Sequence, residues 1–348
     1  MLIAVDVGRS STKVSYFKEG DSKAESFEIP SLVATSFSSF SRPDSALVNS
    51  YSDAEVSQIE VKATQGGWNK DFADFFMFGK QAQKQGGAVS AFSEGSQFHK
   101  FGVAMILFVV AKVSDSTRDA KISLAINLTY SNNEAVSFYS SALKGKHTVA
   151  LGKVKGGRIV GDEISFTISD LYCFQQGYAS VFNFINTEHF DLVQHGRGVI
   201  VDIGRFTVDF SKVEELTLVD GTSVDYGTRY LITRLLEEIS QSSGVKLTVD
   251  EVERSFIQRK LGFSNLSGKQ VCPWELLQKS SLLDEYYKAI KIALNNFVGE
   301  ERIDYVILCG GGSHLIDSRF SKDYRIQILP LDYVRSNVSG MLKMLSIQ

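Results

Sequence analysis

The sequence predicts an α/β protein of two domains that arose by duplication of one unit. A chain of 348 residues is too long for one ordinary hydrophobic core and suits two domains of typical size. Two near-copies of one peptide begin at Val5 and Val201. Each half has the same expected order of a strand meander, a helix, a strand and a helix, which an internal duplication explains.

The repeated peptide reads VDVGR at residues 5–9 and VDIGR at residues 201–205. In each copy an apolar run ends in an Asp and a Gly, a hydroxyl residue follows, and strand-like alternation resumes, which predicts strand, tight turn and returning strand. We name the copies turn 1 (residues 5–13) and turn 2 (residues 201–209). Each turn can direct backbone N–H groups and a hydroxyl at a phosphate, with its Asp within reach of a hydrated metal ion. Two facing turns would hold a nucleotide tail between two half-molecules.

Composition limits the classes of function. A hydrophobic content of 43%, a charged content of 22% and four prolines describe a well-folded soluble protein. The net charge of −3 offers no basic surface for direct nucleic-acid binding, so any association with DNA is expected to run through another protein. The three cysteines have neither metal-ligand nor disulfide spacing, which predicts a reducing cytoplasm. We expect no signal peptide, membrane anchor or histidine metal site, and the most apolar stretch, 101–113, is too short to span a bilayer.

The first half alternates between strand and helix signals. Period-two alternation marks strands, and apolar residues at helical spacing mark helices. In chain order we expect a meander of strands 2–7, 12–17 and 24–29, a strand at 56–61 near an aromatic cluster (Phe72, Phe75, Phe76, Phe78), helix 97–113, strand 120–128, and helix 132–143 opened by an Asn cap. Residues 34–75 look like part of a less regular inserted subdomain.

The second half repeats these signals around turn 2. We expect, in order, strands 149–154 and 164–168, helix 172–186, turn 2 within 199–213, strand 215–219, helices 230–240, 249–260 and 276–298, strand 305–308, and a closing helix 331–345. Strand 305–308 leads into Gly310-Gly311-Gly312-Ser313, and we expect a helix to open at Ser313. Glycines there allow close backbone approach, and a helix N-terminus adds partial positive charge. This predicts a third ligand-binding glycine site.

Three motifs carry a resemblance to a known superfamily. Asp6-x-Gly8-x-x-x-x-Lys13, Asp202-x-Gly204-x-x-Thr207-x-Asp209 and Gly310 to Ser313 resemble the phosphate-one, phosphate-two and adenosine motifs of the actin, Hsp70 and sugar-kinase superfamily. Spacing and length are most similar to the ParM (StbA) branch, the bacterial actin-like plasmid-segregation ATPases. The resemblance covers most of the chain and is weakest at residues 34–95.

The resemblance implies a duplicated actin-like, ribonuclease H-like fold with two domains flanking a nucleotide cleft. Domain I would span 1–180, with an inserted subdomain at about 34–95. Domain II would span 181–330, and residues 331–348 would form a C-terminal helix packing back on domain I.

The resemblance also implies roles for single residues. Asp6 and Asp202 would hold Mg²⁺ through water, since Mg²⁺ keeps several of its waters. The phosphates of ATP or ADP would contact Ser10, Ser11, Lys13, Gly204 and Thr207. Gly8, Arg9 and Arg205 are further candidates for nucleotide binding in the same turns. The adenosine would contact Gly310, Gly311, Gly312 and Ser313, with Gly227 near the ribose and Arg254 near the base or ribose. The sequence does not distinguish ATP from GTP.

Arg9 and Arg205 depart from the superfamily pattern, because relatives usually carry small residues after the turn glycine. Phe206 fills a position that often holds Thr or Gly. Guanidinium groups suit phosphate oxygens, so one or both arginines could reach the γ-phosphate. Equally, both could point away and pair with a carboxylate, and the sequence leaves the two alternatives open.

The residue that positions the attacking water is a second departure. Relatives carry a Glu or Gln before the helix that links the domains, because phosphoryl transfer depends on positioning. Alignment on Gly177-Tyr178 puts Tyr172 at that position, and a Tyr cannot act as a carboxylate base. Gln175, Gln176 and Asp170 are the alternatives, and we select Gln175 as the catalytic residue.

The function expected from the resemblance is a polymerising ATPase that drives plasmid DNA segregation. Its partners would be further copies of itself, head to tail, and a DNA-binding adaptor protein that carries a plasmid centromere-like site, with no direct nucleic-acid or membrane contact. The alternative is a monomeric small-molecule kinase, which would need Asp170 as its base. A chaperone ATPase is a third possibility that the length disfavours, and fold alone does not choose among the three.

Overall fold

The computed structural model describes residues 1–18, 20–35, 58–64, 75–79, 82, 89–90, 97–114, 120–128, 133–155, 158–265, 268–324, 327–329 and 331–347. The chain divides into two units. Unit 1 comprises Met1–Gln175 and Val338–Gln348, and unit 2 comprises Gln176–Asn337. The chain thus passes between the units at two places, after Gln175 and after Asn337. Each unit is described by itself.

Unit 1 is built on one curled mixed sheet. Its strand order is β3-β2-β1-β8-β10-β9-β5-β6-β4-β7. The strands are β1 (Leu2–Val7), β2 (Ser11–Phe17), β3 (Glu25–Pro30), β4 (Leu32–Thr35), β5 (Gln58–Thr64), β6 (Phe75–Phe78), β7 (Val89–Ser90), β8 (Ala120–Leu128), β9 (Gly145–Lys155) and β10 (Arg158–Gln175). β1 pairs with β2 antiparallel and with β8 parallel. The 18-residue β10 pairs first with β9 and then with β8, so it carries the sheet around the bend.

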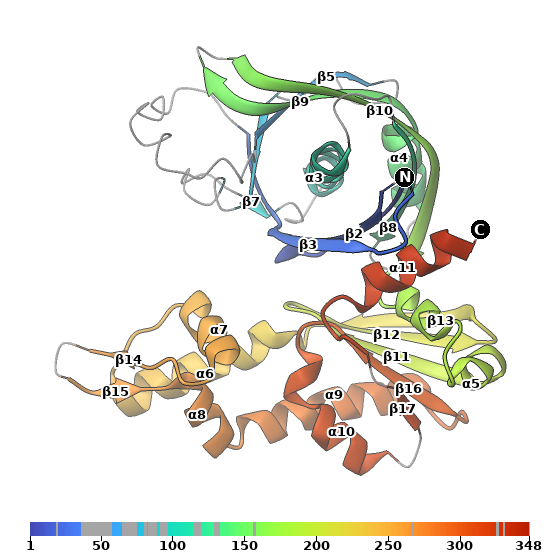
Figure 1. Ribbon diagram of the computed structural model, residues 1–348. Coiled ribbons are helices and arrows are strands. Elements are labelled where there is room, and N and C mark those ends of the chain that lie inside the picture. Colours follow the sequence, from blue (N-terminus) through green and yellow to red (C-terminus); the bar gives the residue numbers. More distant parts are fainter. Residues whose placement is uncertain are drawn as a thin grey trace. The chain divides into compact units, whose positions relative to one another are not determined.

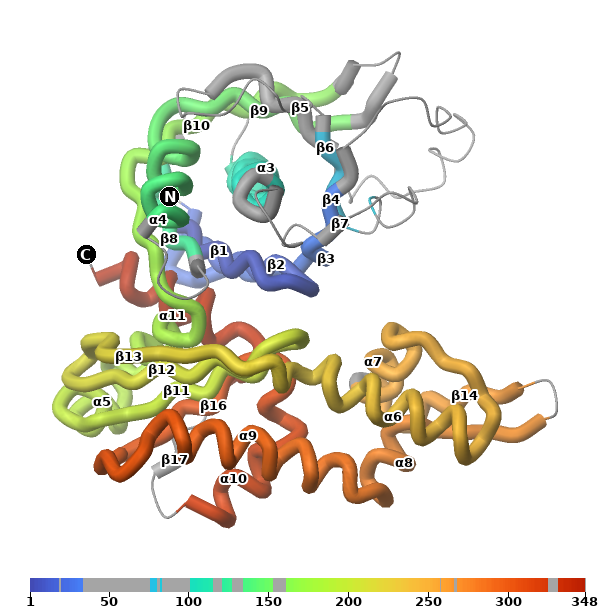
Figure 2. The backbone as a smooth tube through the Cα atoms, turned by 180° about the vertical axis from the view of Figure 1, so that it is seen from behind, coloured from blue at the N-terminus to red at the C-terminus, as the bar shows by residue number. Residues whose placement is uncertain are grey.

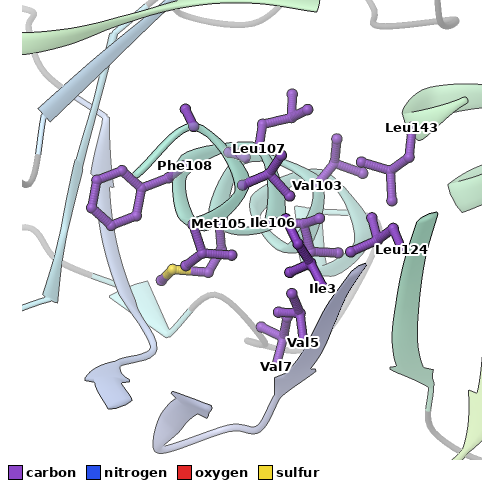
Figure 3. Close-up of a cluster of buried hydrophobic side chains, with 14 of the residues drawn as sticks. Ile3, Val5, Val7, Val103, Met105, Ile106, Leu107, Phe108, Leu124 and Leu143 are labelled. Atoms are coloured by element: carbon purple, nitrogen blue, oxygen red, sulfur yellow. The ribbon is translucent and has the colours of Figure 1, made fainter. Parts of the chain in front are cut away.

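The curled sheet surrounds helix α3 (Gln97–Val113), as Figure 1 shows. Residues from Phe101 to Ala111 are buried on every side of this helix. A helix that is apolar all round must be covered on all sides, which explains its central place. In Figure 3 its side chains pack against Ile3, Val5 and Leu124 from β1 and β8, with Leu143 from α4 (Asn133–Leu143) nearby.

The sheet of unit 2 repeats the order of five neighbouring strands in the sheet of unit 1. Its sheet has the order β13-β12-β11-β16-β17, with β11 (Arg197–Ile203), β12 (Val208–Glu214), β13 (Thr217–Val224), β16 (Tyr305–Cys309) and β17 (Gln327–Leu329). β11 pairs with β12 antiparallel and with β16 parallel, as β1 does with β2 and β8. The matching order β3-β2-β1-β8-β10 in unit 1 shows the predicted duplication in the topology of the protein.

Helices supply the rest of unit 2. They are α5 (Phe190–His195), α6 (Thr228–Ser243), α7 (Val249–Gln258), α8 (Pro273–Lys279), α9 (Leu282–Val298), α10 (Asp317–Asp323) and the start of α11 (Ser336–Ile347). The apolar faces of α6, α7 and α9 pack in one core with β11, β12 and β16. Figure 2 shows α6, α7, α8 and the hairpin β14 (Phe263–Ser264) and β15 (Gln270–Val271) grouped at the end of the unit away from α5.

The central strands lie where their sequences predict. β1, β11 and β16 are almost entirely buried, and each reads as a nearly continuous apolar run, which is typical of strands covered on both faces. Asp6 and Asp202 are the acidic residues of β1 and β11, and each lies one residue before its strand ends. In open α/β sheets ligands bind beyond the carboxyl ends of such strands.

Three expected helices were wrong in position or extent. The segment 172–186 is not one helix, because β10 continues to Gln175, Gly177 has a φ of 83°, and only a 3₁₀ helix, Tyr178–Phe184, follows. The segment 276–298 is two helices, because Ser280 is extended and ends α8. The segment after Gly312 opens with a three-residue 3₁₀ helix, Ser313–Leu315, before α10 begins.

Smaller differences concern element ends. The hairpin between β12 and β13 turns at Glu215 and Leu216, which both have positive φ, so β13 begins at Thr217. The closing helix begins at Ser336 instead of Leu331. The predicted cap Asn132, the aromatic Phe72 and most of the region 34–95 lie outside the described residues. No helix in the described ranges is both long enough and apolar enough to cross a membrane.

Candidate functional site

Turn 1 is a tight hairpin at the end of β1. The Gly8 N–H donates to the Ser11 carbonyl at 3.1 Å, and a Cβ on Gly8 would lie 2.9 Å from that oxygen. Asp6 is only 6% exposed and pairs across the hairpin with Lys13. The Lys13 Nζ lies 3.8 Å from Asp6 Oδ2, so this ion pair is loose. The turn therefore combines a buried carboxylate with a lysine beside it.

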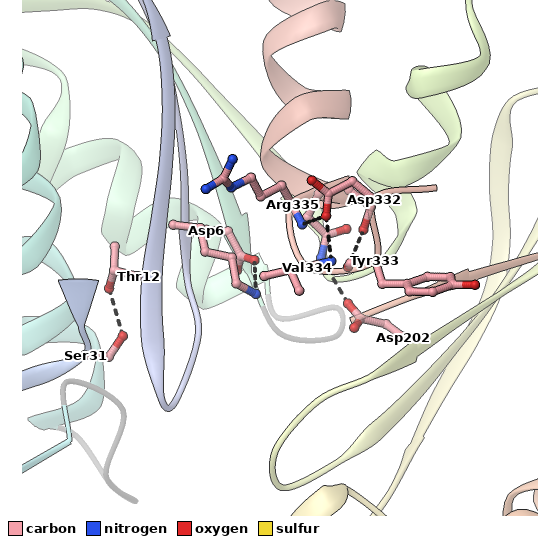
Figure 4. Close-up of polar contacts among 11 residues, drawn as sticks. Asp6, Thr12, Ser31, Asp202, Asp332, Tyr333, Val334 and Arg335 are labelled. Carbon is pink, nitrogen blue, oxygen red and sulfur yellow. Dashed lines mark hydrogen bonds and ion pairs between the residues drawn. The ribbon is translucent and has the colours of Figure 1, made fainter. Parts of the chain in front are cut away.

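One segment supports turn 1 from outside the hairpin. The Ser31 N–H donates to the Ser10 carbonyl at 3.0 Å, and the hydroxyls of Thr12 and Ser31 are hydrogen-bonded at 2.8 Å (Figure 4). Thr12 is fully buried, whereas Arg9 and Ser10 are exposed at the tip of the turn. The tip thus presents Arg9 and Ser10 to solvent on a fixed base.

Turn 2 has the same hairpin geometry. The Gly204 N–H donates to the Thr207 carbonyl at 2.9 Å, as Gly8 does to Ser11. Asp202 is 3% exposed and pairs across the hairpin with Asp209, whose carboxylate accepts a hydrogen bond from Thr207 Oγ1 at 3.1 Å. The position that holds Lys13 in turn 1 therefore holds an acidic residue in turn 2.

The start of helix α6 fixes turn 2. The N–H groups of Gly227, Thr228 and Arg229 donate to the carbonyls of Phe206, Gly204 and Arg205 at 3.1, 3.0 and 2.8 Å. A Cβ on Gly227 would lie 2.3–2.5 Å from backbone atoms of Arg205 and Phe206, so only glycine allows this contact. The N-terminal N–H groups of α6, which a helix leaves without internal partners, are thus satisfied by the turn. Gly227 has a structural reason to be glycine independent of any ribose.

Arg205 pairs with carboxylates of helix α7. Its Nε lies 2.8 Å from Glu253 Oε1, and its Nη2 donates to Asp250 Oδ1 at 3.3 Å. Burial raises the pKa of Glu253, and the charge of Arg205 partly offsets that rise. The sequence left two alternatives for Arg205, contact with the γ-phosphate or pairing with a carboxylate. In the structure Arg205 is paired with acidic side chains. A role of Arg205 toward phosphate stays a prediction.

Two guanidinium groups lie near the ring of Phe206. The Cζ atoms of Arg205 and Arg229 lie 5.8 and 5.3 Å from the centre of its ring. Cations at such distances from a ring face are attracted to it. The unexpected Phe206 therefore helps hold Arg205 on the side of α7, and the two departures from the superfamily pattern act together.

Asp202 is enclosed by residues that are distant in the sequence. Asn337 Nδ2 donates to its Oδ2 at 3.0 Å. A Cβ on Gly310 would lie 2.3 Å from its Oδ1, and a Cβ on Gly177 would lie 3.3 Å from its Cβ. The carboxylate is thus held from several sides. The sequence reasoning missed Asn337, because no local pattern relates it to a residue 135 positions earlier.

The third glycine site divides into packed and open positions. Gly310 has a φ of 83°, and a Cβ on Gly312 would lie 2.5 Å from both Ile203 and Thr228. By contrast, a Cβ on Gly311 would meet nothing within 4 Å. Ser313 is buried, and its hydroxyl donates to the Cys309 carbonyl. Gly311 is therefore the position of this site that is open to a ligand.

The remaining predicted residues lie in both units. Gln175 ends β10 and pairs with Leu128 of β8. Arg254 is exposed on α7. Unit 1 thus brings together Asp6, Gly8, Arg9, Ser10, Ser11 and Lys13, and unit 2 brings together Asp202, Gly204, Arg205, Thr207, Gly227 and the Gly310–Ser313 segment. Within the described part of the chain, no group of three or more His, Cys, Asp or Glu side chains could hold a metal ion by itself.

Comparison with known proteins places the fold. Residues 200–322 match the family model of the archaeal actin homologue MreB-like, C-terminal domain. No curated protein is similar enough to the sequence to count as a match. Among solved structures, the archaeal actin homologue Ta0583 in complex with ADP has 19% identity and a TM-score of 0.73, covering 100% of this chain and 99% of its own.

Two ParM proteins are similar over the same length. Bacillus thuringiensis ParM with AMPPNP has 20% identity and a TM-score of 0.70, covering 100% of this chain and 99% of its own. The apo psk41 ParM has 15% identity and a TM-score of 0.67, covering 99% and 97%. The predicted fold class is confirmed: the chain has the α/β fold of the actin homologues, ParM included, and its second unit carries the match to the archaeal actin-like family.

Proposed function

We propose that this protein is a nucleotide-dependent, filament-forming actin-like ATPase. The observation that carries the proposal is the pair of equivalent turns, each with a buried Asp at its strand end and a Gly N–H that donates to the carbonyl three residues on. They occur in a chain that shares its fold over its whole length with a solved ADP complex. Similar proteins have been solved with AMPPNP and with ATP, which supports an adenine nucleotide as the ligand.

The two turns and the open glycine would divide the contacts to the nucleotide. Turn 1 offers the exposed Ser10 and the lysine side chain of Lys13, which suit phosphate oxygens. Turn 2 offers the backbone of Gly204 and the hydroxyl of Thr207. Gly311 leaves room for the adenosine, because no atom of the described residues lies within 4 Å of the place where its Cβ would be.

Each turn offers a carboxylate of the kind that suits a hydrated Mg²⁺ ion. Asp6 and Asp202 are buried carboxylates at strand ends, and Mg²⁺ is usually bound by one or two carboxylates together with phosphates and several waters. That arrangement needs no cluster of three protein ligands. When bound, the ion would neutralise charge on the β- and γ-phosphates. Asp6 and Asp202 would orient its waters.

Hydrolysis requires a group that orients the attacking water. We propose Gln175 for this role, because it ends β10 beside the strand that pairs with β1. An amide can accept from and donate to a water molecule, and phosphoryl transfer depends mainly on such positioning.

Self-assembly and plasmid segregation are the finer parts of the proposal. The similarity to two ParM structures supports head-to-tail filaments that move plasmid copies through an adaptor protein bound to a centromere-like site. A non-closing head-to-tail contact gives an open helical filament. The cytoplasm is the compartment consistent with that role.

The kinase alternative receives less support. It needs Asp170 as a base, but Asp170 is exposed within β10, five residues before the strand ends. Its carboxylate accepts hydrogen bonds from Ser169 at 2.9 Å and from Ser123 at 3.2 Å. Asp170 thus lies among hydroxyl groups of the sheet, away from the strand end that carries Gln175.

Right-angle light scattering after addition of ATP and Mg²⁺ tests the proposal. We expect scattering to rise above a critical protein concentration and to decay as phosphate is released, with ADP giving no lasting rise. Pelleting and electron microscopy of the same samples would show filaments. An unchanged signal across the accessible protein concentrations, with ATP shown to be bound, would overturn the filament proposal.

A further inference from the structure

Asn337 lies in direct contact with Asp202, the carboxylate of turn 2. It is the second residue of α11 and only 5% exposed. Its Nδ2 donates to Asp202 Oδ2 at 3.0 Å. The orientation of this amide follows from its partner. If the amide oxygen stood in place of the nitrogen, it would face a carboxylate oxygen with no hydrogen between them. The donor therefore faces Asp202.

The acceptor of the same amide is unused. Asn337 Oδ1 is fully buried and has no hydrogen-bond partner among the residues that the structure describes. Buried polar atoms are nearly always paired, so one without a partner calls for an explanation such as a bound water or ion. Since Oδ1 and Nδ2 share one carbon atom, this acceptor is held close to the carboxylate of Asp202.

Asn337 and Gly310 each restrict how the carboxylate of Asp202 can turn. Asn337 holds Oδ2, and Gly310 lies so close to Oδ1 that a Cβ there would come within 2.3 Å. Asn337 is itself fixed through its neighbour Ser336. Asn183 Nδ2 donates to the Ser336 carbonyl at 2.7 Å and to the Ser180 carbonyl at 3.0 Å.

We propose that Asn337 is a positioning residue for a hydrated divalent cation at Asp202. Its Nδ2 orients the carboxylate, and its Oδ1 accepts a hydrogen bond from a water molecule that the cation carries. Waters on Mg²⁺ are hydrogen-bond donors, so they need acceptors, and an amide oxygen adds one without adding charge. Groups that orient metal ligands in this way commonly change metal affinity 10- to 100-fold when removed. The inference rests on the proposed nucleotide and Mg²⁺ binding.

The test compares ADP affinity with and without the metal. Isothermal titration calorimetry of the full chain with ADP, in Mg²⁺ and in EDTA, gives the factor by which the metal strengthens ADP binding. Because coupling between two ligands is reciprocal, ADP strengthens metal binding by the same factor. We expect Asn337→Ala to reduce the factor about tenfold or more and to leave affinity in EDTA within about twofold of the parent. Asn337→Ser, whose hydroxyl is too short to reach Asp202, serves as a second variant if the first does not fold.

Asn183→Ala is the matched control. It removes an amide that supports the same helix start without touching Asp202, so a merely structural role of Asn337 predicts equal effects of both variants. The inference is overturned if Asn337→Ala keeps the parent metal factor, if Asn183→Ala lowers it equally, or if the parent binds ADP with no gain from Mg²⁺. A parent chain that binds no ADP in either buffer would overturn the proposed function as well, so the two failures are distinguishable.

Discussion

Turn 1 and turn 2 have the same hairpin geometry but differ in the residues that surround them. Turn 1 has a lysine opposite its Asp and is hydrogen-bonded to Ser31. Turn 2 has Asp209 opposite its Asp, is bound to the start of α6 by three backbone hydrogen bonds, and has its arginine paired with a carboxylate of α7. The same motif therefore occurs once with a cationic residue and once with an acidic residue opposite its buried Asp.

This difference indicates a division of roles between the copies. In turn 1 the residue opposite the buried Asp is the cationic Lys13, and a lysine suits contact with phosphate. In turn 2 the charge of Arg205 is balanced by Glu253 and Asp250. We infer that turn 1 contributes charge to the nucleotide and that turn 2 contributes backbone groups and a fixed carboxylate.

The largest effect is expected from crowding the support of turn 2. Gly227→Ala would place a Cβ 2.3–2.5 Å from the backbone of residues 205 and 206, so the turn or α6 must move. We expect a loss of about 3 kcal/mol in the free energy of unfolding, the scale of overpacking in a close-packed site. Denaturant unfolding measures it.

Gly311→Ala is the matched control for that experiment, because a Cβ there meets nothing within 4 Å. Its free energy of unfolding should stay within about 0.5 kcal/mol of the parent. Equal stability of the two variants would show that the contact between Gly227 and turn 2 does not support the turn.

Gln175→Ala tests whether unit 1 also carries the hydrolytic step. We expect turnover of ATP to fall about a hundredfold, because a positioned group at the reacting water typically contributes at least that much. ADP affinity should change little, since the amide is proposed to contact water and not the nucleotide. Phosphate-release kinetics and ADP titration measure the two effects, and unchanged turnover would remove Gln175 from the mechanism.

Gly311→Val tests the third glycine site of unit 2. The open space around this position predicts an unchanged free energy of unfolding. A branched side chain would fill the space proposed for adenosine, so ADP affinity should fall about tenfold, equivalent to about 1.4 kcal/mol. Parent-like ADP affinity in a folded Gly311→Val chain would place the adenosine elsewhere.

The ion pair of Arg205 gives the smallest effect, which depends on pH. Burial raises the pKa of Glu253 above 4.5, so the folded chain holds this proton more readily than the unfolded chain. The free energy of unfolding therefore falls as pH rises above 4.5 and Glu253 loses its proton, and this loss of stability remains at higher pH. Removing the charge of Arg205 should enlarge this cost, by less than about 1 kcal/mol because the pair is partly exposed.

A pair of variants measures that effect. The free energy of unfolding of Arg205→Ala should lie below that of Arg205→Ala/Glu253→Gln at pH 7, and the gap should close as pH falls toward 4.5. A gap that is constant with pH would show that Glu253 does not titrate differently in the folded chain.

The local parts of this protein could be predicted from its sequence. Turns 1 and 2 follow from an Asp-x-Gly peptide between strand signals, and the buried central strands follow from unbroken apolar runs. The duplication of one α/β unit was anticipated from the repeat. These features depend on neighbouring residues, so a single sequence contains the information.

Contacts between distant residues could not be predicted. Nothing near Asn337 indicates that it donates to Asp202, and nothing near Gly227 indicates that it packs on Phe206. The helix expected at 172–186 was wrong because aromatic residues such as Tyr172 and Phe174 suit strands as well as helices, and pairing with β8 decides for the strand. Arg205 could be left only as two alternatives, since its partners lie on α7, 45 or more residues later.

The most direct test of the division between the turns is the affinity of the non-hydrolysed analogue AMPPNP for Lys13→Met and Arg205→Met. The two side chains are matched in exposure, at 17% and 24%. We predict that Lys13→Met weakens binding about tenfold or more, with a smaller dependence on salt, because a charge-assisted phosphate contact is lost. Arg205→Met should stay within about twofold of the parent. An equal loss in both variants, or a greater loss in Arg205→Met, would contradict the account.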